Sequence, residues 1–216
     1  MTEVLDAYGI RCCVSLNLAV LEHYREIAEA MVQRNWDLMS HGIYNTRYLY
    51  SYDEPRERAF YRDCIDTLKR HTGKLLKGML GPAISGTLCT PQLLAAAGLR
   101  YVCDWVNDEQ LYCMTTSAGE LVSLPIALEL DDVHALWERR VPVDRYAIML
   151  GESFAGLYQD GARTGRLLVL NLHPWLIGQP FRIGFLDAAL EGIMRHQGVW
   201  AAHGTAIVDW FRQYKT

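Results

Sequence analysis

The sequence contains no long block of basic residues. Its 21 Lys and Arg residues are distributed along a chain that also carries 25 Asp and Glu residues, and the net charge is −4. Binding to nucleic acid or to an anionic membrane surface relies on clustered Lys and Arg side chains. We therefore expect neither nucleic acid nor a membrane as a partner.

Long apolar runs are also missing from the chain. No stretch approaches the roughly 18 uninterrupted apolar residues of a transmembrane helix, and the first residues include Glu3 and Asp6 where a secretory signal peptide needs cations. We therefore expect a cytoplasmic, soluble protein. The 216 residues can bury a substantial core, and no segment resembles a linker, so we predict a single domain over residues 1–216.

Several common metal-binding, phosphate-binding and catalytic motifs are absent as well. The six cysteines form no C-x-x-C pair, which argues against a zinc finger and favours small buried thiols in a reducing compartment. The glycine-rich stretch "GMLGPAISGT", residues 78–87, lacks the lysine of a phosphate-binding loop. Its hydroxyl residues have no nucleophile-elbow motif around them, so a catalytic serine is also not expected there.

Apolar runs alternate with helical spacing from one end of the chain to the other. Tyr24, Ile27, Ala28 and Met31 follow the i, i+3, i+4, i+7 pattern of an amphipathic helix, for example. Strands are expected at residues 12–18, 36–39, 75–80, 101–105, 121–130, 167–172 and 199–202, and helices around 24–31, 61–68, 90–97, 142–158, 181–196 and 206–214. This alternation predicts an α/β fold with parallel strands, either a (β/α) barrel or an open doubly wound sheet.

Polar side chains gather where the predicted strands end. In both architectures the functional site lies at the carboxyl ends of the strands. The polar residues that follow four of the apolar runs are His41 and Asn45; Asp104, Asn107 and Asp108; Glu129, Asp131 and Asp132; and His173. Four strands would thus bring histidine, carboxylate and amide groups to one face of the sheet.

Each of these residues also has a purely structural interpretation. A single histidine after a strand is more often structural than catalytic. Asp131 or Asp132 could be the N-cap of a short helix over residues 134–137, and Asn45 could stabilise a turn through its own backbone. The convergence of four strands is the argument for function.

Several segments together resemble the polysaccharide deacetylase superfamily. They are "WDLMSHG", "GPAIS", "YVCDWVNDEQ", "SLPIALELDD" and "LVLNLHPWLIGQPFRIGFLDAALEGIMRHQGVWAAHG", in this order. The resemblance is nearest to the branch of chitooligosaccharide-deacetylase-like proteins and allantoinases. It implies a deformed (β/α) barrel of about seven parallel strands that hydrolyses non-peptide C–N bonds, often N-acetyl groups on sugars.

The resemblance implies a metal position that this chain matches only in part. The family carries His-x-x-x-His on its second strand; His41 matches the first histidine, and Asn45 stands in the place of the second. The implied cofactor is one divalent metal such as zinc, held by His41 and Asn45. An amide oxygen is a weaker ligand than imidazole for such an ion, so the two residues could instead hold the substrate carbonyl.

The remaining site residues are also assigned from the resemblance. His173 matches the family's late histidine and is expected to be the general acid, with His41 and Asp104 as further catalytic residues. Leu80 stands where the family has an arginine. The expected substrate-binding residues are Asn45, Trp105, Asn107, Asp108, Asp131 and Trp175. The base that activates water would be Asp131 or Asp132, or a carboxylate of the family's first strand.

That first strand has no counterpart in this sequence. The chain begins in the helix that would lead to the second strand, so we expect a barrel that is incomplete at the N-terminus, with an open sheet edge. An open edge exposes backbone donors and acceptors that a partner subunit can cover. We therefore predict a homo-oligomer.

The sequence favours one function and leaves two others open. The favoured function is a hydrolase of amide C–N bonds, most of all a deacetylase of N-acetylated saccharides, acting on a small-molecule or oligosaccharide substrate. The first alternative is a catalytically impaired barrel that serves as a binding or structural protein. The second is a metal-independent, allantoinase-like ring-opening hydrolase.

Overall fold

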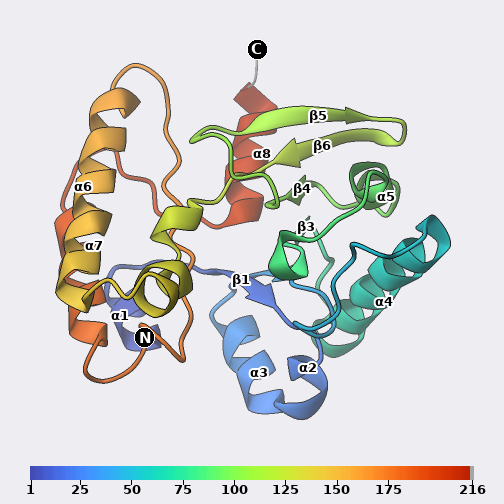
Figure 1. The fold of residues 1–216 in the computed structure, drawn as a ribbon, viewed down its shortest axis with the longest axis horizontal. Helices are drawn as coiled ribbons and strands as arrows, with labels where there is room; N and C mark the ends of the chain where they lie inside the picture. Colours follow the sequence, from blue (N-terminus) through green and yellow to red (C-terminus); the bar gives the residue numbers. More distant parts are fainter. Residues whose placement is uncertain (215–216) are drawn as a thin grey trace. The chain divides into compact units, whose positions relative to one another are not determined.

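The computed structural model describes residues 1–214, and their contacts divide them into two compact units (Figure 1). The first, which we call the helical unit, comprises Met1–Ile10, Val106–Gln110 and Pro125–Ala201. The second, the sheet unit, comprises Arg11–Trp105, Leu111–Leu124 and the chain from Ala202 onward. Each unit is built from segments that are far apart in sequence.

The sheet unit contains six strands in the order β1-β2-β3-β4-β6-β5. They are β1 (Cys13–Leu16), β2 (Asp37–Ser40), β3 (Gly78–Met79), β4 (Tyr101–Val102), β5 (Tyr112–Thr116) and β6 (Gly119–Ser123). All neighbouring pairs are parallel except β5 and β6, which form an antiparallel hairpin. The register places Ser40 beside Met79 and Met79 beside Val102, so the carboxyl ends of β2, β3 and β4 lie next to one another.

Helices connect these strands and cover the sheet. They are α2 (Val20–His23), α3 (Arg25–Gln33), α4 (Glu54–Thr72), the short 3₁₀ turn η1 (Pro82–Ile84), α5 (Thr90–Ala96) and α8 (Gly204–Tyr214). The apolar stripe of α4, including Tyr61, Cys64 and Leu68, is buried in the same core as Leu38 and Met79 of the strands. Hydrophobic burial along one helical stripe therefore holds the α and β layers together.

Helix α4 begins and ends where its sequence dictates. Asp53 is the N-cap and its side chain accepts a hydrogen bond from the backbone N–H of Arg56 at 2.9 Å. Gly73 follows the last turn in the left-handed conformation, with φ of +69°, which glycine adopts without the steric cost of a Cβ atom. The helix predicted around residues 61–68 is confirmed, and it extends from Glu54 to Thr72.

A buried carboxylate links α4 to the segment that leads into α5. Glu57 is fully buried, and it accepts hydrogen bonds from the hydroxyls of Tyr61 at 2.5 Å, of Thr87 at 2.6 Å and of Thr90. Its position in the first turn of the helix also places the charge near the positive end of the helix dipole. Three donors and the dipole together compensate for the loss of hydration.

We expect Glu57→Ala to lower the free energy of unfolding by about 3–5 kcal/mol, because two buried hydroxyls and one partly buried hydroxyl lose their acceptor. Glu57→Gln keeps the shape and one acceptor oxygen, so its loss should be smaller. The matched control is Glu54→Ala, which removes only an exposed pair with Arg58 and should change stability by less than about 1 kcal/mol. Urea unfolding measures all three, and equal losses for Glu57→Ala and Glu54→Ala would contradict the assignment.

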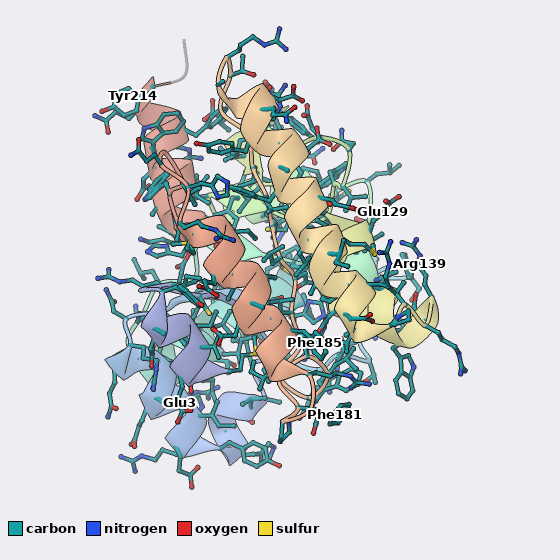
Figure 2. All side chains as sticks on the ribbon, turned by 90° about the vertical axis from the view of Figure 1, so that its left-hand side faces the viewer. Glu3, Glu129, Arg139, Phe181, Phe185 and Tyr214 are labelled. Carbon is teal, nitrogen blue, oxygen red and sulfur yellow. The ribbon has the colours of Figure 1, made fainter. Side chains whose placement is uncertain are left out.

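The helical unit is dominated by two long helices that pack side by side (Figure 2). They are α6 (Val143–Gly161) and α7 (Ile183–Met194), and the unit also contains α1 (Thr2–Ala7), the 3₁₀ turn η2 (Leu128–Leu130) and the π-helix η3 (Val133–Glu138). Leu150 and Leu190 are among the buried residues of the pair. The hydroxyl of Tyr8, directly after α1, donates a hydrogen bond of 2.9 Å to the carboxylate of Asp187 in α7.

The α/β class and the long helices that the sequence predicts are confirmed, while some strands differ. Residues 167–172 and 199–202, which we expect to be strands, are not among the strands of residues 1–214. Residues 167–172 are only partly buried and make isolated backbone hydrogen bonds, Leu167 N–H to the Glu109 carbonyl and Asp132 N–H to the Asn171 carbonyl, so they form no continuous ladder. The segment expected at 121–130 is instead β6 followed by η2, and the hairpin partner β5 was not expected.

The sheet ends at β1 on one side and at β5 on the other within the described residues. β1 is therefore an edge strand of the described sheet, while the incomplete barrel and the homo-oligomer stay predictions. None of the helices in residues 1–214 has the length and apolar character needed to cross a membrane. Of the six cysteines, which are all free, Cys64 and Cys103 are buried and Cys113 is exposed.

Candidate functional site

Two adjacent acids lie at the centre of the helical unit. Asp131 and Asp132 follow η2, and only 4% and 0% of their surfaces are exposed. The hydroxyl of buried Tyr146 in α6 donates a hydrogen bond of 2.7 Å to the carbonyl of Leu130, which fixes the backbone just before the acids. Buried carboxylates need hydrogen-bond donors to compensate for lost hydration, and each acid has its own set.

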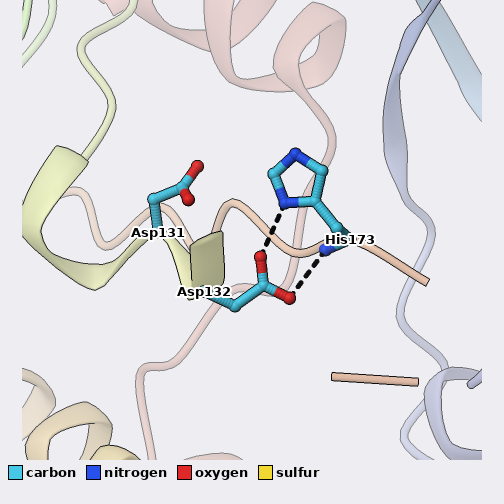
Figure 3. A group of neighbouring side chains, drawn as sticks. All are labelled: Asp131, Asp132 and His173. Atoms are coloured by element: carbon cyan, nitrogen blue, oxygen red, sulfur yellow. Dashed lines mark hydrogen bonds and ion pairs between the residues drawn. The ribbon is translucent and has the colours of Figure 1, made fainter. Parts of the chain in front are cut away.

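Asp132 holds His173 from two directions (Figure 3). One oxygen of Asp132 lies 2.6 Å from His173 Nδ1, and the other accepts the backbone N–H of His173 at 2.9 Å. The second oxygen also accepts the N–H of Ile177 at 3.3 Å. The carboxylate can only accept, so Nδ1 carries the proton and Nε2 is the nitrogen available for chemistry.

This contact also sets the proton affinity of His173. The hydrogen bond that His173 donates to Asp132 raises the pKa of His173 above its usual value, and the negative charges of Asp132 and Asp131 add to the increase, while burial opposes it. The side chain remains 36% exposed. His173 is therefore a partly accessible imidazole whose charged form is stabilised, which suits proton donation near neutral pH.

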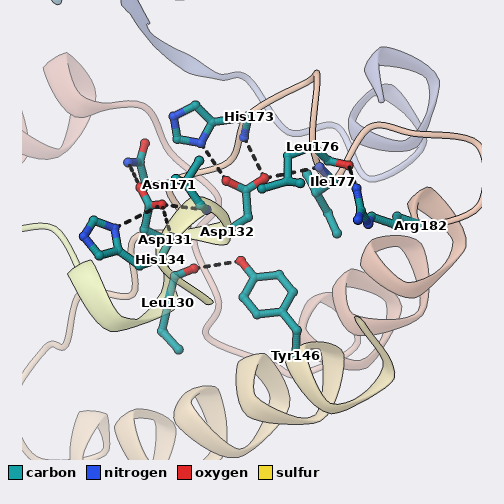
Figure 4. A network of polar contacts seen from close by, with 11 residues as sticks. Leu130, Asp131, Asp132, His134, Tyr146, Asn171, His173, Leu176, Ile177 and Arg182 are labelled. Atoms are coloured by element: carbon teal, nitrogen blue, oxygen red, sulfur yellow. Dashed lines mark hydrogen bonds and ion pairs between the residues drawn. The ribbon is translucent and has the colours of Figure 1, made fainter. Parts of the chain in front are cut away.

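Asp131 performs a different task from its neighbour (Figure 4). One oxygen accepts the backbone N–H groups of Val133 at 2.8 Å and His134 at 3.1 Å, at the start of η3. The other oxygen accepts a hydrogen bond from the Asn171 side chain. The His134 ring also lies close, with Nδ1 3.4 Å from Asp131. The capping interpretation of Asp131 is thus correct, and the substrate-binding role that we predict for it stays a prediction.

Asp131, Asp132 and His173 lie close enough together to hold a cation, with ligand atoms within 4.8 Å of one another. Their hydrogen bonds fit another arrangement better. Both oxygens of each acid already accept N–H donors, and the shortest contact to His173 uses a protonated nitrogen. A carboxylate that accepts the Nδ1–H of a histidine acts on the imidazole, which it orients, and leaves Nε2 as the available nitrogen. We therefore interpret the cluster as a carboxylate–histidine pair with a supporting acid.

In the sheet unit, His41 and Asp104 bind the two ends of one peptide group. His41 follows β2, and its Nδ1 lies 2.8 Å from the carbonyl oxygen of Leu80. Asp104, two residues after β4, accepts the N–H of Gly81 at 2.7 Å. The Leu80 carbonyl and the Gly81 N–H belong to the same peptide bond, so a continuous hydrogen-bonded path joins imidazole and carboxylate through the peptide that follows β3.

The Leu80 carbonyl fixes the protonation of His41, because a carbonyl can only accept. Nδ1 therefore carries a proton, as in histidines that bind metals or substrates through Nε2. Asn45, however, is exposed, and its neutral amide oxygen is a weak ligand. His41 and Asn45 alone do not fit a catalytic zinc-like ion, which needs about three protein ligands. We derive no reaction step through a metal.

Burial raises the pKa of Asp104 to about 7, although the hydrogen bond from Gly81 opposes the increase. Gly81 is required here, since a Cβ atom on it would lie 2.6 Å from the carbonyl oxygen of Ser85 and 3.0 Å from the Asp104 carboxylate. A carboxyl group with a pKa near neutral is a candidate for proton transfer. Its raised pKa also has a consequence for stability.

We expect Asp104→Asn to flatten the pH dependence of stability between about pH 4 and pH 7. In this window the folded protein retains a proton on Asp104 that the unfolded chain has lost, because the folded pKa is about 7 against a usual 3.8. Stability therefore falls as pH rises through the window. Thermal unfolding at pH 5 and pH 8 measures the difference, with exposed Asp108→Asn as control. If the stability of Asp104→Asn falls between pH 5 and pH 8 by as much as that of the unchanged protein, Asp104 is not the source of the pH dependence.

The other predicted site residues have simpler surroundings. Asp108 is exposed and accepts the N–H groups of Glu109 and Gln110, which makes it a local turn residue. Trp105 is partly buried against the core of the sheet unit. Asn107 is exposed. Trp175 is 53% exposed and lies beside His173, with ring centroids 6.1 Å apart.

Three residues of the helical unit were missed by the sequence interpretation: His134, Asn171 and Trp137. Asn171 stands two positions before His173, and alternate residues of an extended segment point to the same side. That spacing could have indicated that both face the adjacent acids. His134 stands three positions after Asp131, the spacing of neighbours on one helical face. Trp137 contacts Trp175, which no local pattern in the sequence indicates.

No sequence profile of a known family and no curated protein sequence matches this chain at a significant level. Solved structures do match it. Puue allantoinase superposes with a TM-score of 0.91 at 24% identity, over 99% of this chain and 71% of its own. A probable polysaccharide deacetylase from Pseudomonas aeruginosa PAO1 matches with a TM-score of 0.88 at 23% identity, over 100% and 72%.

A polysaccharide-deacetylase-like protein from Mycobacterium smegmatis matches with a TM-score of 0.86 at 22% identity, over 99% of this chain and 76% of its own. At these identities the likeness concerns the fold alone. The chain therefore has the fold of the polysaccharide deacetylases and of allantoinase, which confirms at the level of fold the resemblance indicated by its sequence segments.

Proposed function

We propose that this protein hydrolyses amide C–N bonds that are not peptide bonds, and that its substrates are N-acetylated saccharides. The observation that carries the proposal is the Asp132–His173 pair, in which a fully buried carboxylate orients a partly exposed imidazole. The shared fold supports the reaction class, because the matching structures include proteins named as a deacetylase and an allantoinase.

His173 is the general acid of this proposal. Hydrolysis adds water to the amide carbonyl carbon and breaks the C–N bond, and the departing nitrogen must gain a proton. The Nε2–H of the His173 imidazolium donates that proton, and Asp132 stabilises the charged ring before the transfer. After the reaction the neutral ring recovers its proton from solvent, since its side chain is partly exposed.

The two adjacent acids are poor candidates for the base that activates water. Asp131 and Asp132 are both buried, and each of their oxygens accepts at least one hydrogen bond within the helical unit. A carboxylate engaged in this way orients its neighbours and has little capacity left to accept a proton from water. His41 and Asp104 remain proposed catalytic residues of the sheet unit, and variants of each test them separately.

The proposal is tested by incubating the purified chain with N-acetylchitooligosaccharides and, separately, with allantoin. Release of acetate and of free amine from the saccharides is the expected result, and it should be strongly reduced in the His173→Ala variant. Turnover that is the same in this variant would exclude His173 as the acid. No release from any amide substrate would favour the alternative of a binding or structural protein.

A ring-opening hydrolase of the allantoinase type is the second candidate, and the partial match at His41 and Asn45 favours it, since that pair does not complete a metal site. Cyclic and acyclic amides require the same protonation of a leaving nitrogen, so His173 would serve in both. Turnover of allantoin, unaffected by a chelator that strips zinc-like ions, would support this candidate over the deacetylase.

A further inference from the structure

The exposed aromatic side chains beside His173 form an ordered row. The rings of His173 and Trp175 lie 6.1 Å apart at 60°, and those of Trp175 and Trp137 lie 6.1 Å apart at 77°. Trp175 and Trp137 are 53% and 64% exposed. Other tryptophans of the chain, such as Trp210, are equally exposed, so what distinguishes this pair is its contact with a candidate catalytic imidazole.

Both indoles are attached to backbone that the acid pair holds in place. Asp132 binds the N–H groups of His173 and Ile177, which fixes the turn that carries Trp175 between them. The turn is closed by the N–H of Leu176, which donates to the carbonyl of His173 at 2.9 Å. Gly178 permits this turn, since a Cβ atom on it would lie 2.3 Å from the carbonyl oxygen of Pro174.

Trp137 is held through the other acid. It belongs to η3, whose first N–H groups, those of Val133 and His134, are bound by Asp131. The adjacent acids thus fix the backbone that carries each indole, and the two indoles pack edge to face. A rigid aromatic surface loses little conformational entropy when a ligand binds to it.

We propose that Trp137 and Trp175 bind a pyranose ring of the substrate chain, next to the sugar whose N-acetyl group is hydrolysed at His173. The axial C–H groups of a pyranose form an apolar face that packs on an indole, while its hydroxyls stay in water or contact polar groups. His134 and Glu138 supply such groups on the same short helix as Trp137. This inference rests on the proposed function and specifies its substrate as an oligosaccharide of at least two rings.

A small ureide such as allantoin has no second ring to occupy this surface. The pair comprises two side chains beside the ionisable His134 and Glu138, whereas a stable protein interface buries on the order of 1,200–2,000 Å² in total. A row that begins at the catalytic imidazole fits a linear chain of rings better than it fits a globular partner. The saccharide is therefore the occupant that these side chains favour.

The test compares Trp137→Ala, Trp137→Phe and Trp210→Ala with the unchanged protein. Trp210 is the matched control, since it is a 52% exposed tryptophan on α8 of the sheet unit. The probes are N-acetylglucosamine and its β-1,4-linked tetramer. Binding is measured by calorimetry, and amine release gives kcat and KM. Trp137→Ala should raise Kd and KM for the tetramer about tenfold with little change in kcat, and Trp137→Phe should restore part of the affinity.

The monosaccharide should be affected by neither change, and Trp210→Ala should behave as the unchanged protein. Equal tetramer affinity in Trp137→Ala and the unchanged protein would overturn the inference, as would an equal loss for monomer and tetramer. A change of oligomeric state in Trp137→Ala at unchanged saccharide affinity would show a protein interface instead. Tetramer binding that depends on Trp137 without any hydrolysis would support the inference while contradicting the proposed function, so the two outcomes are distinguishable.

Discussion

His173→Ala is expected to lower kcat for amide hydrolysis by about 10²–10⁴, the range that a positioned general acid or base contributes. The leaving nitrogen of an amide is a poor leaving group unless it is protonated, and the imidazolium of His173 is the partly exposed acid of the helical unit. KM should change much less than kcat, because the proton is transferred in the transition state and not on binding.

The matched control is His23→Ala, which removes an exposed histidine of α2 in the sheet unit. It should retain the activity of the unchanged protein. Initial rates of acetate release, with circular dichroism to verify folding, distinguish the two variants. Equal rates for His173→Ala and His23→Ala would remove His173 from the mechanism, while a loss that follows only from unfolding would appear in the spectra of the variant.

The helices of this protein could be predicted because their signals are local. The spacing of Tyr61, Cys64 and Leu68 indicates one buried stripe, and Gly73 marks the end of the helix through its left-handed backbone. Both signals depend on residues within a few turns of one another. The physical requirements that produce them, apolar burial along one face and a C-terminal cap, are therefore readable from the sequence.

Strands were harder to predict than helices, because a strand must pair with a second segment of the chain. Residues 167–172 have the apolar composition of a buried strand, but they have no ladder partner. The hairpin of β5 and β6 was missed for the opposite reason. Its loop residues, Ser117 and Ala118, are not the Asn-Gly or Asp-Gly pair that marks a two-residue turn. The apolar composition of residues 167–172 thus indicated a strand that does not form. The loop residues of the hairpin gave no sign of β5.

In the candidate site, too, local features could be predicted from the sequence, while contacts between distant residues could not. His173 and the adjacent acids were identified because they follow apolar runs, which is a local property. Which acid binds the histidine could not be derived, since Asp131 and Asp132 differ by one position and 41 residues separate Asp132 from His173. In the folded protein Asp131 binds backbone N–H groups of η3, and Asp132 binds the imidazole of His173. Adjacent and chemically identical residues therefore have different roles.

Because Asp132 is the acid that binds the imidazole of His173, a substitution of Asp132 is the second change expected to have a large effect on activity. Asp132→Asn should lower kcat at neutral pH by about 10²–10⁴, comparable to the loss when an Asp–His pair is changed to Asn–His in other hydrolases. The Asn oxygen can still accept the N–H groups of His173 and Ile177, which leaves its NH₂ group facing Nδ1 of the ring. Nδ1 must then be unprotonated, so the imidazolium is disfavoured.

The pH profile separates this electrostatic role from a structural one. The pKa of His173 is raised mainly by Asp132, and a general acid loses activity as pH rises through its pKa. In Asp132→Asn that descending limb should move to lower pH, while the folded fraction stays high. Asp132→Ala, which removes the acceptor of two backbone N–H groups, should instead lose about 2–5 kcal/mol of stability. A descending limb that stays in place in Asp132→Asn would show that another group donates the proton, because only the acid coupled to Asp132 can respond to the loss of its charge.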